Sequence, residues 1–210
     1  MTYLIKEIFY TLQGEGSHAG RPAVFCRFSR CNLWTGLEKD RYRAICKFCD
    51  TDFVGTDGTG GGRFGTPDEL ADAVEEAWPS EDRDNRFVVC TGGEPLLQLD
   101  AAAVDALHHR GFEVAVETNG TRIPPAGVDW LCVSPKIGAE LVVTSGDELK
   151  LVYPQVGGDP AQFEHLDFRS FRLQPLDDER VSHTAAAVEY CMKNPRWSLS
   201  LQTHKYLGIR

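Results

Sequence analysis

The stretch Phe87-Val88-Val89-Cys90-Thr91-Gly92-Gly93-Glu94-Pro95 joins a short apolar strand pattern directly to a small polar cluster. The same arrangement recurs where other apolar runs end at Glu117-Thr118-Asn119-Gly120, Ser134-Pro135-Lys136, Gln174-Pro175-Leu176-Asp177 and Gln202-Thr203-His204. Any one of these clusters could simply be the beginning of a loop. Because parallel strands place their carboxyl ends at one edge of a sheet, the five together predict a site at that edge.

Helical patterns separate several of these strands. Thr66-Pro67-Asp68-Glu69 is typical of a capped helix start, Asp100 and Gly111 bracket a second helix, and residues 184–192 form a third. The Gly-rich residues 55–65 are expected to form a flexible loop. Strands are expected at Tyr3–Tyr10, Ala23–Phe28, Phe87–Cys90, Phe112–Val116, Trp130–Val133, Leu149–Tyr153, Phe171–Leu173 and Trp197–Leu201. This alternation predicts an α/β fold with a mainly parallel sheet, in a single domain over residues 1–210.

Three cysteines, Cys31, Cys46 and Cys49, lie in an irregular segment with no clear period. An iron–sulfur cluster needs converging thiolates, and a two-residue spacer lets neighbouring cysteines provide them. Three cysteines would hold three irons of a four-iron cluster and leave the fourth iron open to a small ligand.

Two other interpretations of this cysteine group remain open from spacing alone. A structural zinc site would need a fourth ligand, for which Cys26 is the nearest candidate, but Cys26 alternates with its neighbours inside an expected strand. A thioredoxin-like redox pair would need Cys46 at a helix start just after a strand. The remaining thiols lie in strand or helix patterns and are expected to be core residues; these are Cys90, Cys132 and Cys191.

The spacing Cys31-x14-Cys46-x2-Cys49, followed by Gly92-Gly93-Glu94-Pro95, resembles radical S-adenosylmethionine enzymes, although most of them have C-x3-C-x2-C. With this longer spacer, the sequence resembles one family closely, the 7-carboxy-7-deazaguanine synthases. The motifs that share this similarity are Gln13-Gly14-Glu15-Gly16, Phe25-Cys26-Arg27-Phe28, Cys49-Asp50-Thr51 and Gln202-Thr203-His204-Lys205-Tyr206-Leu207, so that it covers essentially the whole chain.

The resemblance implies a fold and an activity. The fold is an open, partial (β/α) barrel of the radical S-adenosylmethionine type, two or three strands short of eight. The reaction converts 6-carboxy-5,6,7,8-tetrahydropterin to 7-carboxy-7-deazaguanine with loss of ammonia, a lyase step toward queuosine. A 5′-deoxyadenosyl radical derived from the cofactor would begin it by abstracting hydrogen from C6 of the pterin.

Site residues also follow from the resemblance. Cys31, Cys46 and Cys49 would hold a 4Fe-4S cluster. The implied S-adenosyl-L-methionine contacts are Phe48, Cys49, Asp50, Gly93, Glu94, Asn119, Ser134, Pro135, Lys136, Gln174, Pro175, Leu176 and Asp177. The implied substrate contacts are Leu12, Gln13, Gly14, Glu15, Arg27, Thr91, Glu117, His204 and Arg210.

Three of the implied contacts carry a specific chemistry. Arg27 is suited to pair with a carboxylate, although an exposed strand arginine is the commoner case. Arg210 would supply a terminal carboxylate to the substrate. Thr51 would bind Mg2+ together with the substrate carboxylate, with Asp50 and Asp52 flanking it.

Bulk composition excludes several classes of partner. A formal net charge of −9 without clustered Lys and Arg argues against a nucleic-acid ligand. No run approaches the roughly 20 apolar residues that span a bilayer, and the start lacks a secretory pattern, so we expect a cytoplasmic protein without disulfides.

The resemblance implies a homodimer and a reducing electron donor such as a flavodoxin or ferredoxin. The rival hypotheses are a zinc-stabilised binding protein and a radical activase that acts on a protein partner. Metal analysis separates the first rival from the main hypothesis, and turnover of the pterin separates the second.

Overall fold

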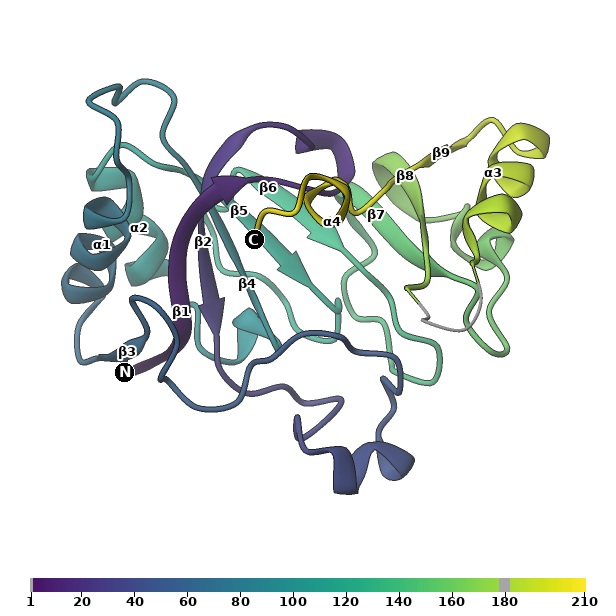
Figure 1. Cartoon of the computed structure of the whole chain (residues 1–210), viewed down its shortest axis with the longest axis horizontal. Helices are drawn as coiled ribbons and strands as arrows, with labels where there is room; N and C mark the ends of the chain where they lie inside the picture. The colour runs from purple at the N-terminus through teal and green to yellow at the C-terminus, as the bar shows by residue number, and fades with distance from the viewer. Residues whose placement is uncertain (1, 178–181) are drawn as a thin grey trace.

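The computed structural model describes residues 2–177 and 182–210 of the chain. Its strands form one curved nine-stranded sheet, in the order β3-β1-β2-β4-β5-β6-β7-β8-β9, with helices outside it (Figure 1). The strands are β1 (Tyr3–Leu12), β2 (Pro22–Phe28), β3 (Gly62–Phe64), β4 (Phe87–Gly92), β5 (Glu113–Thr118), β6 (Trp130–Val133), β7 (Ser145–Tyr153), β8 (Asp167–Pro175) and β9 (Trp197–Leu199).

The direction of the strands confirms the predicted parallel sheet. β2 and β4 through β9 are mutually parallel, whereas β1 runs antiparallel to both β2 and β3. Pairing runs from β3 at one end to β9 at the other without closing, so the sheet is an open partial barrel. The sheet has one strand more than the eight expected from the sequence, because residues 62–64 pair with β1 as β3, and its seven parallel strands exceed the five or six that the resemblance implied.

Two helices begin where their capping residues predicted. In α1 (Pro67–Glu76), Thr66 Oγ1 accepts a hydrogen bond from the Glu69 amide at 3.2 Å, and the Glu69 carboxylate accepts one from the Gly65 amide at 2.6 Å. Before α2 (Ala101–His109), Asp100 accepts a hydrogen bond from the Ala103 amide at 3.0 Å. These bonds satisfy amide groups that an uncapped helix start would leave without partners.

Two apolar cores hold the helices against the outside of the sheet. One packs α1 and α2 against the early strands and includes Tyr3, Val88 and Leu107. The other packs α3 (Thr184–Lys193) against the late strands and includes Leu149 and Trp197. Both cores use the outer face of the sheet, so most of the inner face is left for polar side chains, apart from a small apolar cluster of Ala23, Phe87, Val89 and Ala115.

The prediction that strands and helices alternate along the chain was only partly correct. No α-helix occurs among the described residues between β5 and β6, β6 and β7, or β7 and β8; the last connection has only the 3-10 turn η4 (Pro160–Phe163). These neighbouring parallel strands are joined by polar loops instead of helices. Such loops carry no apolar stripe from which their structure could have been predicted.

Several strand boundaries also differ from expectation. β7 begins four residues early, at Ser145, and β8 spans Asp167–Pro175 because pairing with β7 recruits polar residues that have little strand propensity of their own. β1 extends to Leu12, whereas β9 stops at Leu199. Within the Gly-rich segment 55–65, residues 62–64 form β3 against β1 and correct the prediction of a continuous loop.

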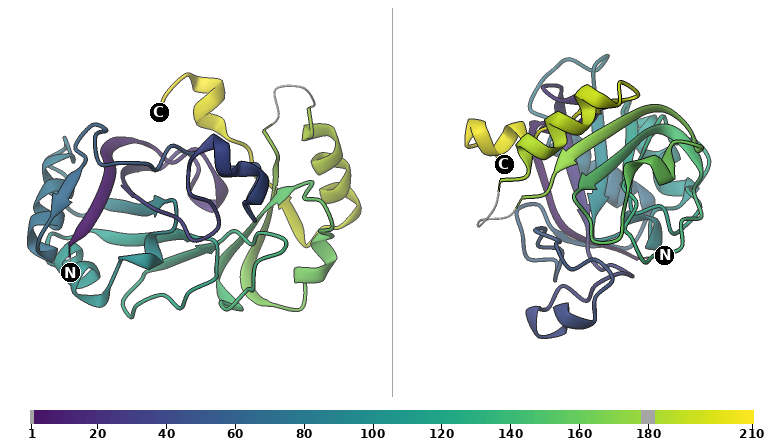
Figure 2. Two further views of the ribbon diagram at one scale, coloured as in Figure 1. Left: turned by 90° about the horizontal axis from the view of Figure 1, so that it is seen from below. Right: turned by 90° about the vertical axis from the view of Figure 1, so that its right-hand side faces the viewer.

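The C-terminal segment runs from β9, at one end of the open sheet, to β1, the strand next to the other end. It contains α4 (Thr203–Leu207), which lies in front of the sheet and separate from α3 (Figures 1 and 2). The Thr203 amide donates to the Gly14 carbonyl at 2.8 Å, and Thr11 Oγ1 donates to the Arg210 main-chain oxygen at 3.0 Å. The chain therefore closes this side of its own barrel. Among the described residues, no helix has the length and apolar character needed to cross a membrane.

Candidate active site

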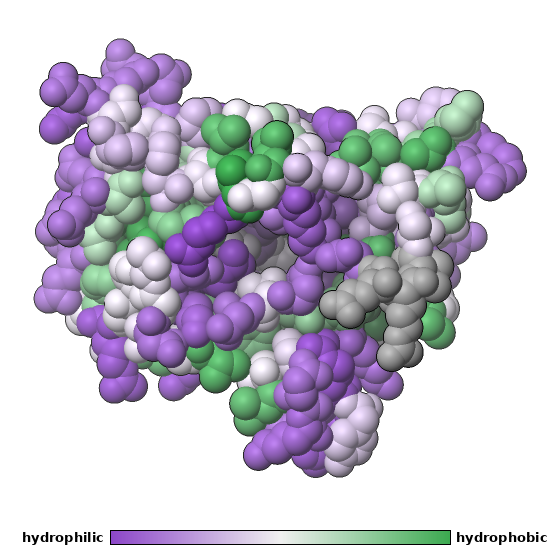
Figure 3. Space-filling view, viewed as in Figure 1, coloured by the Kyte–Doolittle hydropathy of each residue, from purple (hydrophilic) through white to green (hydrophobic). Residues whose placement is uncertain are grey.

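A cavity of about 420 Å³ lies at the carboxyl ends of the parallel strands. Mainly hydrophilic residues surround its opening (Figure 3). Every one of the five polar strand ends contributes to its lining, through residues that include Thr91, Glu117, Ser134, Gln174 and His204. The polar clusters therefore meet at one edge of the sheet, as the sequence predicted.

All three cysteines of the predicted cluster motif, Cys31, Cys46 and Cys49, line this cavity. Their loop packs on the buried rings of Trp34 and Phe53. The hydrogen bond between Cys46 and Cys49 lowers the pKa of the Cys49 thiol and raises that of Cys46, while burial raises the pKa of Cys31. The fit to a 4Fe-4S cluster therefore rests on the position of the three thiols around one cavity, where bound iron would hold them as thiolates.

The end of β4 lies directly against the cysteine loop. The Glu94 amide donates to the Arg30 carbonyl at 2.9 Å, and the Gly93 amide donates to the Phe28 carbonyl at 3.1 Å. A Cβ atom on Gly93 would collide with that Arg30 carbonyl and lie 3.0 Å from Cβ of Cys31. Glycine is therefore needed for this close approach, which fixes the strand end beside the first cysteine.

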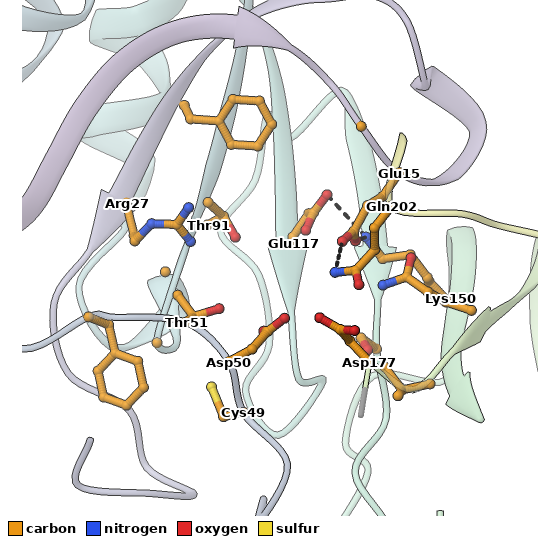
Figure 4. Close-up of a pocket in the computed structure, with 18 of the residues that line it drawn as sticks. Glu15, Arg27, Cys49, Asp50, Thr51, Thr91, Glu117, Lys150, Asp177 and Gln202 are labelled. Carbon is orange, nitrogen blue, oxygen red and sulfur yellow. Dashed lines mark hydrogen bonds and ion pairs between the residues drawn. The ribbon is translucent and has the colours of Figure 1, made fainter. Parts of the chain in front are cut away.

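A buried charge network forms another wall of the cavity (Figure 4). Lys150, whose side chain is 5% exposed, lies 2.6 Å from Glu15 and 3.3 Å from Glu117. Gln202 donates to Glu15 at 2.9 Å, and Gln13 donates to Glu117 at 3.0 Å. One ammonium thus faces two carboxylates, and this wall keeps a surplus of hydrogen-bond acceptors for a ligand that carries N–H groups.

The charges of this network stabilise one another against the cost of burial. Burial favours the neutral form of Lys150, but the carboxylates of Glu117 and Glu15 outweigh it and raise the pKa of the lysine. Burial likewise disfavours the charged form of Glu15, yet Lys150 lowers the pKa of that carboxyl to about 2. Both groups are therefore charged at neutral pH.

Arg27 and two threonines lie around a further part of the cavity. The Arg27 guanidinium points inward on the side of Thr91, with Thr51 nearby (Figure 4). Arg27 comes from β2, Thr91 from β4 and Thr51 from the segment that follows Cys49. A cation and two hydroxyl groups in one place suit an anionic part of a ligand.

Comparison with known proteins places this geometry in a family. A model of the radical SAM superfamily matches residues 42–150. The 7-carboxy-7-deazaguanine synthase of Caulobacter vibrioides is 63% identical over 210 residues, and that of Bradyrhizobium diazoefficiens is 62% identical over 211, with the whole of each chain covered. The chain belongs to the 7-carboxy-7-deazaguanine synthase family. A crystal structure of QueE from Escherichia coli superposes with a TM-score of 0.71 at 29% identity, over 97% of this chain and 95% of that one.

Membership in the 7-carboxy-7-deazaguanine synthase family supports the main hypothesis over its rivals. Cys26, the fourth ligand that zinc would need, is buried with Cys90 in the core beneath α1 and α2 instead of facing the cavity. Among the described residues, no three His, Cys, Asp or Glu side chains converge as a single metal ion would require. Cys132 is buried as predicted, whereas Cys191 is only half-buried at the edge of its core.

Most residues predicted for the synthase cofactor lie together. Phe48 and Asp50 line the cavity beside the cysteines, and the strand-end members of the set are Gly93, Asn119, Ser134, Lys136, Gln174, Pro175, Leu176 and Asp177. The Lys136 ammonium donates to the Ser134 carbonyl at 2.6 Å and to its hydroxyl at 2.8 Å. Burial lowers the pKa of Lys136, although the neighbouring cysteines Cys46 and Cys49 oppose that shift.

Glu94 and Pro135 do not line the cavity. Glu94 is fully buried, and its carboxylate accepts hydrogen bonds from Thr118 Oγ1 at 2.7 Å, the Asn119 amide at 2.8 Å and the Leu96 amide at 3.0 Å. Burial raises the pKa of Glu94 in spite of these bonds. In this structure Glu94 ties the end of β4 to the end of β5, which holds Asn119 at the cavity.

All nine residues predicted for the substrate line the cavity: Leu12, Gln13, Gly14, Glu15, Arg27, Thr91, Glu117, His204 and Arg210. The last two come from the C-terminal segment. Beside His204, Lys205 bridges two carboxylates, at 2.9 Å from Asp50 and 2.5 Å from Asp177. This bridge joins α4 to the cysteine loop and to the end of β8.

Some of the cavity residues escaped the sequence analysis. Lys150, Val152, Glu7, Phe9 and Phe25 all line it, but each lies inside a strand and not at a strand end. A signal was present for Lys150, since a lone cation within the apolar run Leu149–Tyr153 is costly unless it faces a polar interior. Glu7 offered no such signal, because plain alternation from Tyr3 and Ile5 would have buried it.

Proposed function

We propose that this chain converts 6-carboxy-5,6,7,8-tetrahydropterin to 7-carboxy-7-deazaguanine with loss of ammonia, as part of queuosine biosynthesis. The observation that carries the proposal is one cavity that joins three cysteine thiols to a wall of buried carboxylates. Identity of 63% over the full length to a protein named for this activity supports it. A radical activase of proteins would need the cysteine side of this cavity but not its wall of buried carboxylates.

The cysteine side of the cavity would hold the cofactors. Cys31, Cys46 and Cys49 would bind a 4Fe-4S cluster, and Phe48 with the strand-end residues would bind S-adenosyl-L-methionine. When bound, these groups supply the organic radical that starts the rearrangement. The Lys136 ammonium would neutralise charge near the thiolates, and the buried Glu94 would hold the strand ends in position.

The carboxylate wall would hold the pterin. Glu15 and Glu117 would accept hydrogen bonds from the N–H groups of its ring, and Lys150 keeps Glu15 ionised by lowering its pKa. Arg27 would pair with the substrate carboxylate. His204 would close the cavity from the C-terminal segment, and the terminal carboxylate predicted for Arg210 remains a prediction.

Magnesium is a further part of this proposal. Thr51 lies at the cavity between Asp50 and Asp52, which also line it. A hydroxyl oxygen and the substrate carboxylate would provide oxygen ligands of the kind that Mg2+ prefers. Removing divalent cations with EDTA should lower turnover, and adding Mg2+ back should restore it; activity that is indifferent to both would refute the magnesium site.

The partners follow from the same proposal. Reduction of the cluster would require a donor such as a flavodoxin or ferredoxin, and the functional unit would be a homodimer. A cytoplasmic location suits a chain whose seven cysteines are all free, because thiols and reduced clusters persist in a reducing compartment.

The decisive experiment is a turnover assay with anaerobically reconstituted and reduced protein. Incubation with S-adenosyl-L-methionine and the carboxylated tetrahydropterin should give 7-carboxy-7-deazaguanine and ammonia, detected by mass spectrometry and an ammonia assay. Formation of 5′-deoxyadenosine without any deazaguanine would leave the cofactor chemistry intact and refute the substrate. Zinc without iron and sulfide would refute the cluster.

A further inference from the structure

Half-way along β1, the strand changes which of its side chains face the cavity. Its register with β2 shifts between Ile5 and Glu7, which marks a β-bulge. Tyr3 and Ile5 lie in the core before the shift and Ile8 lies there after it, whereas Glu7 and Phe9 line the cavity. Strict alternation would have buried Glu7 with Tyr3 and Ile5, so the bulge delivers a carboxylate to the cavity.

Both carboxylate oxygens of Glu7 accept hydrogen bonds from arginine guanidinium groups. Oε1 accepts a hydrogen bond from Arg27 Nε at 2.8 Å, and Oε2 accepts one from Arg210 Nη2. The side chains of Glu7 and Arg27 are only 14% and 19% exposed. The ring of Phe9 lies 4.4 Å from the Arg210 guanidinium and 6.0 Å from that of Arg27. This shielding distinguishes the pair from a solvated surface ion pair, which would hold neither partner firmly.

The Gly-rich segment 55–65 supports the bulge from its other side. The Gly58 amide donates to the Lys6 carbonyl at 2.9 Å, and the Ile8 amide donates to the Thr59 carbonyl at 2.8 Å. Thr59 Oγ1 also accepts a bond from the second guanidinium at 3.3 Å. These contacts give the bulge, and with it the Glu7 side chain, a defined position.

The orientation of Arg27 follows from this arrangement. A guanidinium is planar, so a carboxylate that binds Nε also fixes the directions of both Nη groups. Among the described residues, neither Nη group of Arg27 has a hydrogen-bond partner, and the guanidinium extends into the cavity toward Thr91 (Figure 4). This free edge is oriented in advance for a second carboxylate.

We propose that Glu7 is the positioning residue for the substrate carboxylate, because it holds Arg27 with its Nη edge toward the ligand. The inference rests on the proposed function, which supplies that carboxylate. Charge alone would act in the opposite direction, since Glu7 reduces the positive potential that a bound anion experiences. Removing Glu7 therefore weakens carboxylate binding if it positions Arg27, and strengthens binding if it acts only through its charge.

The test compares two ligands that differ only in the carboxylate. The affinities of the reconstituted holoenzyme for 6-carboxypterin and for unsubstituted pterin are measured by fluorescence titration. Glu7→Ala should weaken binding of 6-carboxypterin by about tenfold, the scale of a charge-assisted hydrogen bond, and that of pterin by less than about twofold. Glu7→Gln should fall between wild type and Glu7→Ala, because its amide oxygen still accepts a bond from Nε.

A matched control breaks a second arginine–glutamate pair away from the cavity. Glu113 binds Arg21 at 2.6 Å, and neither residue lines the cavity, so Glu113→Gln should leave both affinities unchanged. In an Arg27→Ala background, Glu7→Ala should cause less than about a twofold further loss, because the group through which it acts is gone.

Three results would overturn the proposal. The first is tighter or unchanged binding of 6-carboxypterin by Glu7→Ala. The second is an equal loss of affinity for both ligands, or the same loss without Arg27, which would make the role of Glu7 structural. The third is a wild-type protein that does not distinguish the two pterins, which would refute the proposed carboxylate subsite itself and this inference with it.

Discussion

Replacing Lys150 with methionine should destabilise the protein strongly, in a manner that depends on pH. The substitution keeps the approximate size of the side chain but removes the ammonium that lies 2.6 Å from Glu15 and 3.3 Å from Glu117. Breaking a buried ion pair by removing one partner typically costs about 3–5 kcal/mol, because the remaining charge stays buried without compensation. The pKa of Glu15 points the same way, because Lys150 is the main cause that lowers it from 4.5 to about 2 against burial, a net shift on the order of 3 kcal/mol.

The pH dependence follows from the direction of that shift. In the wild type the pKa of Glu15 is lowered, so its stabilising contribution is present above pH 4.5 and is lost as the pH falls toward 2. In Lys150→Met, burial is the largest influence left on Glu15 and is opposed only by Gln202 and His204, so the pKa of Glu15 should rise above its unfolded value. The deficit of the variant should therefore be largest at neutral pH and should shrink as acid protonates the carboxyl.

Urea unfolding of reconstituted protein at pH 7 and pH 5 measures both effects. A double variant, Lys150→Met with Glu15→Gln, should recover part of the loss at pH 7 because it removes one unpaired carboxylate. Lys193→Met is the matched control: Lys193 pairs with Glu189 at 2.5 Å, but both side chains are more than two-thirds exposed, so the change should be small. A loss below about 1 kcal/mol for Lys150→Met, or one that is equal at both pH values, would refute the reasoning.

Three further changes test other parts of the site. Cys46→Ser should abolish the iron–sulfur absorbance and the cleavage of S-adenosylmethionine, whereas Cys191→Ser should retain both, as measured by iron analysis and chromatography. Glu94→Gln should lower the free energy of unfolding by about 1–3 kcal/mol in urea, because its amide nitrogen cannot accept the bonds that the carboxylate accepts. Gly16→Ala should be more destabilising in the same assay than Gly20→Ala; both glycines have positive φ, which costs about 1–2 kcal/mol for alanine, but only at Gly16 would the new Cβ collide with a buried glutamate.

The sequence predicted the parts of the site that depend on local chemistry. Thr91, Glu117, Gln174 and the others follow apolar strands, and in a parallel sheet the ends of such strands must share an edge. The cysteines could also be predicted as cluster ligands from the sequence, because ligand spacing is a local property. Residues at the ends of such strands can therefore be recognised as candidate site residues without knowledge of contacts between distant segments.

Other parts of the site depend on contacts between distant segments. The bulge that turns Glu7 inward depends on pairing with β2 and on the Gly-rich segment 55–65, which the sequence pattern predicted to be a plain loop. The C-terminal segment reaches the cavity only because the sheet stays open between its end strands, β3 and β9. Lys205 illustrates the limit, since neither Asp50 nor Asp177 is near it in sequence. Pairing register and sheet closure are tertiary properties, and no local pattern specifies them.

The long spacer between the first two cysteines has a structural explanation in the fold. Its turn η2 (Glu38–Arg43) carries Arg41, which lies 3.9 Å above the ring of Trp34 and donates to the carbonyls of Lys47 at 2.9 Å and Cys49 at 3.1 Å. Those carbonyls belong to the segment that carries the second and third thiols. A three-residue spacer could not provide such a contact, because the guanidinium must approach the segment from outside while a buried ring supports it. The inserted residues therefore do more than lengthen the loop: they hold the Cys46–Cys49 segment in the conformation that directs both thiols into the cavity.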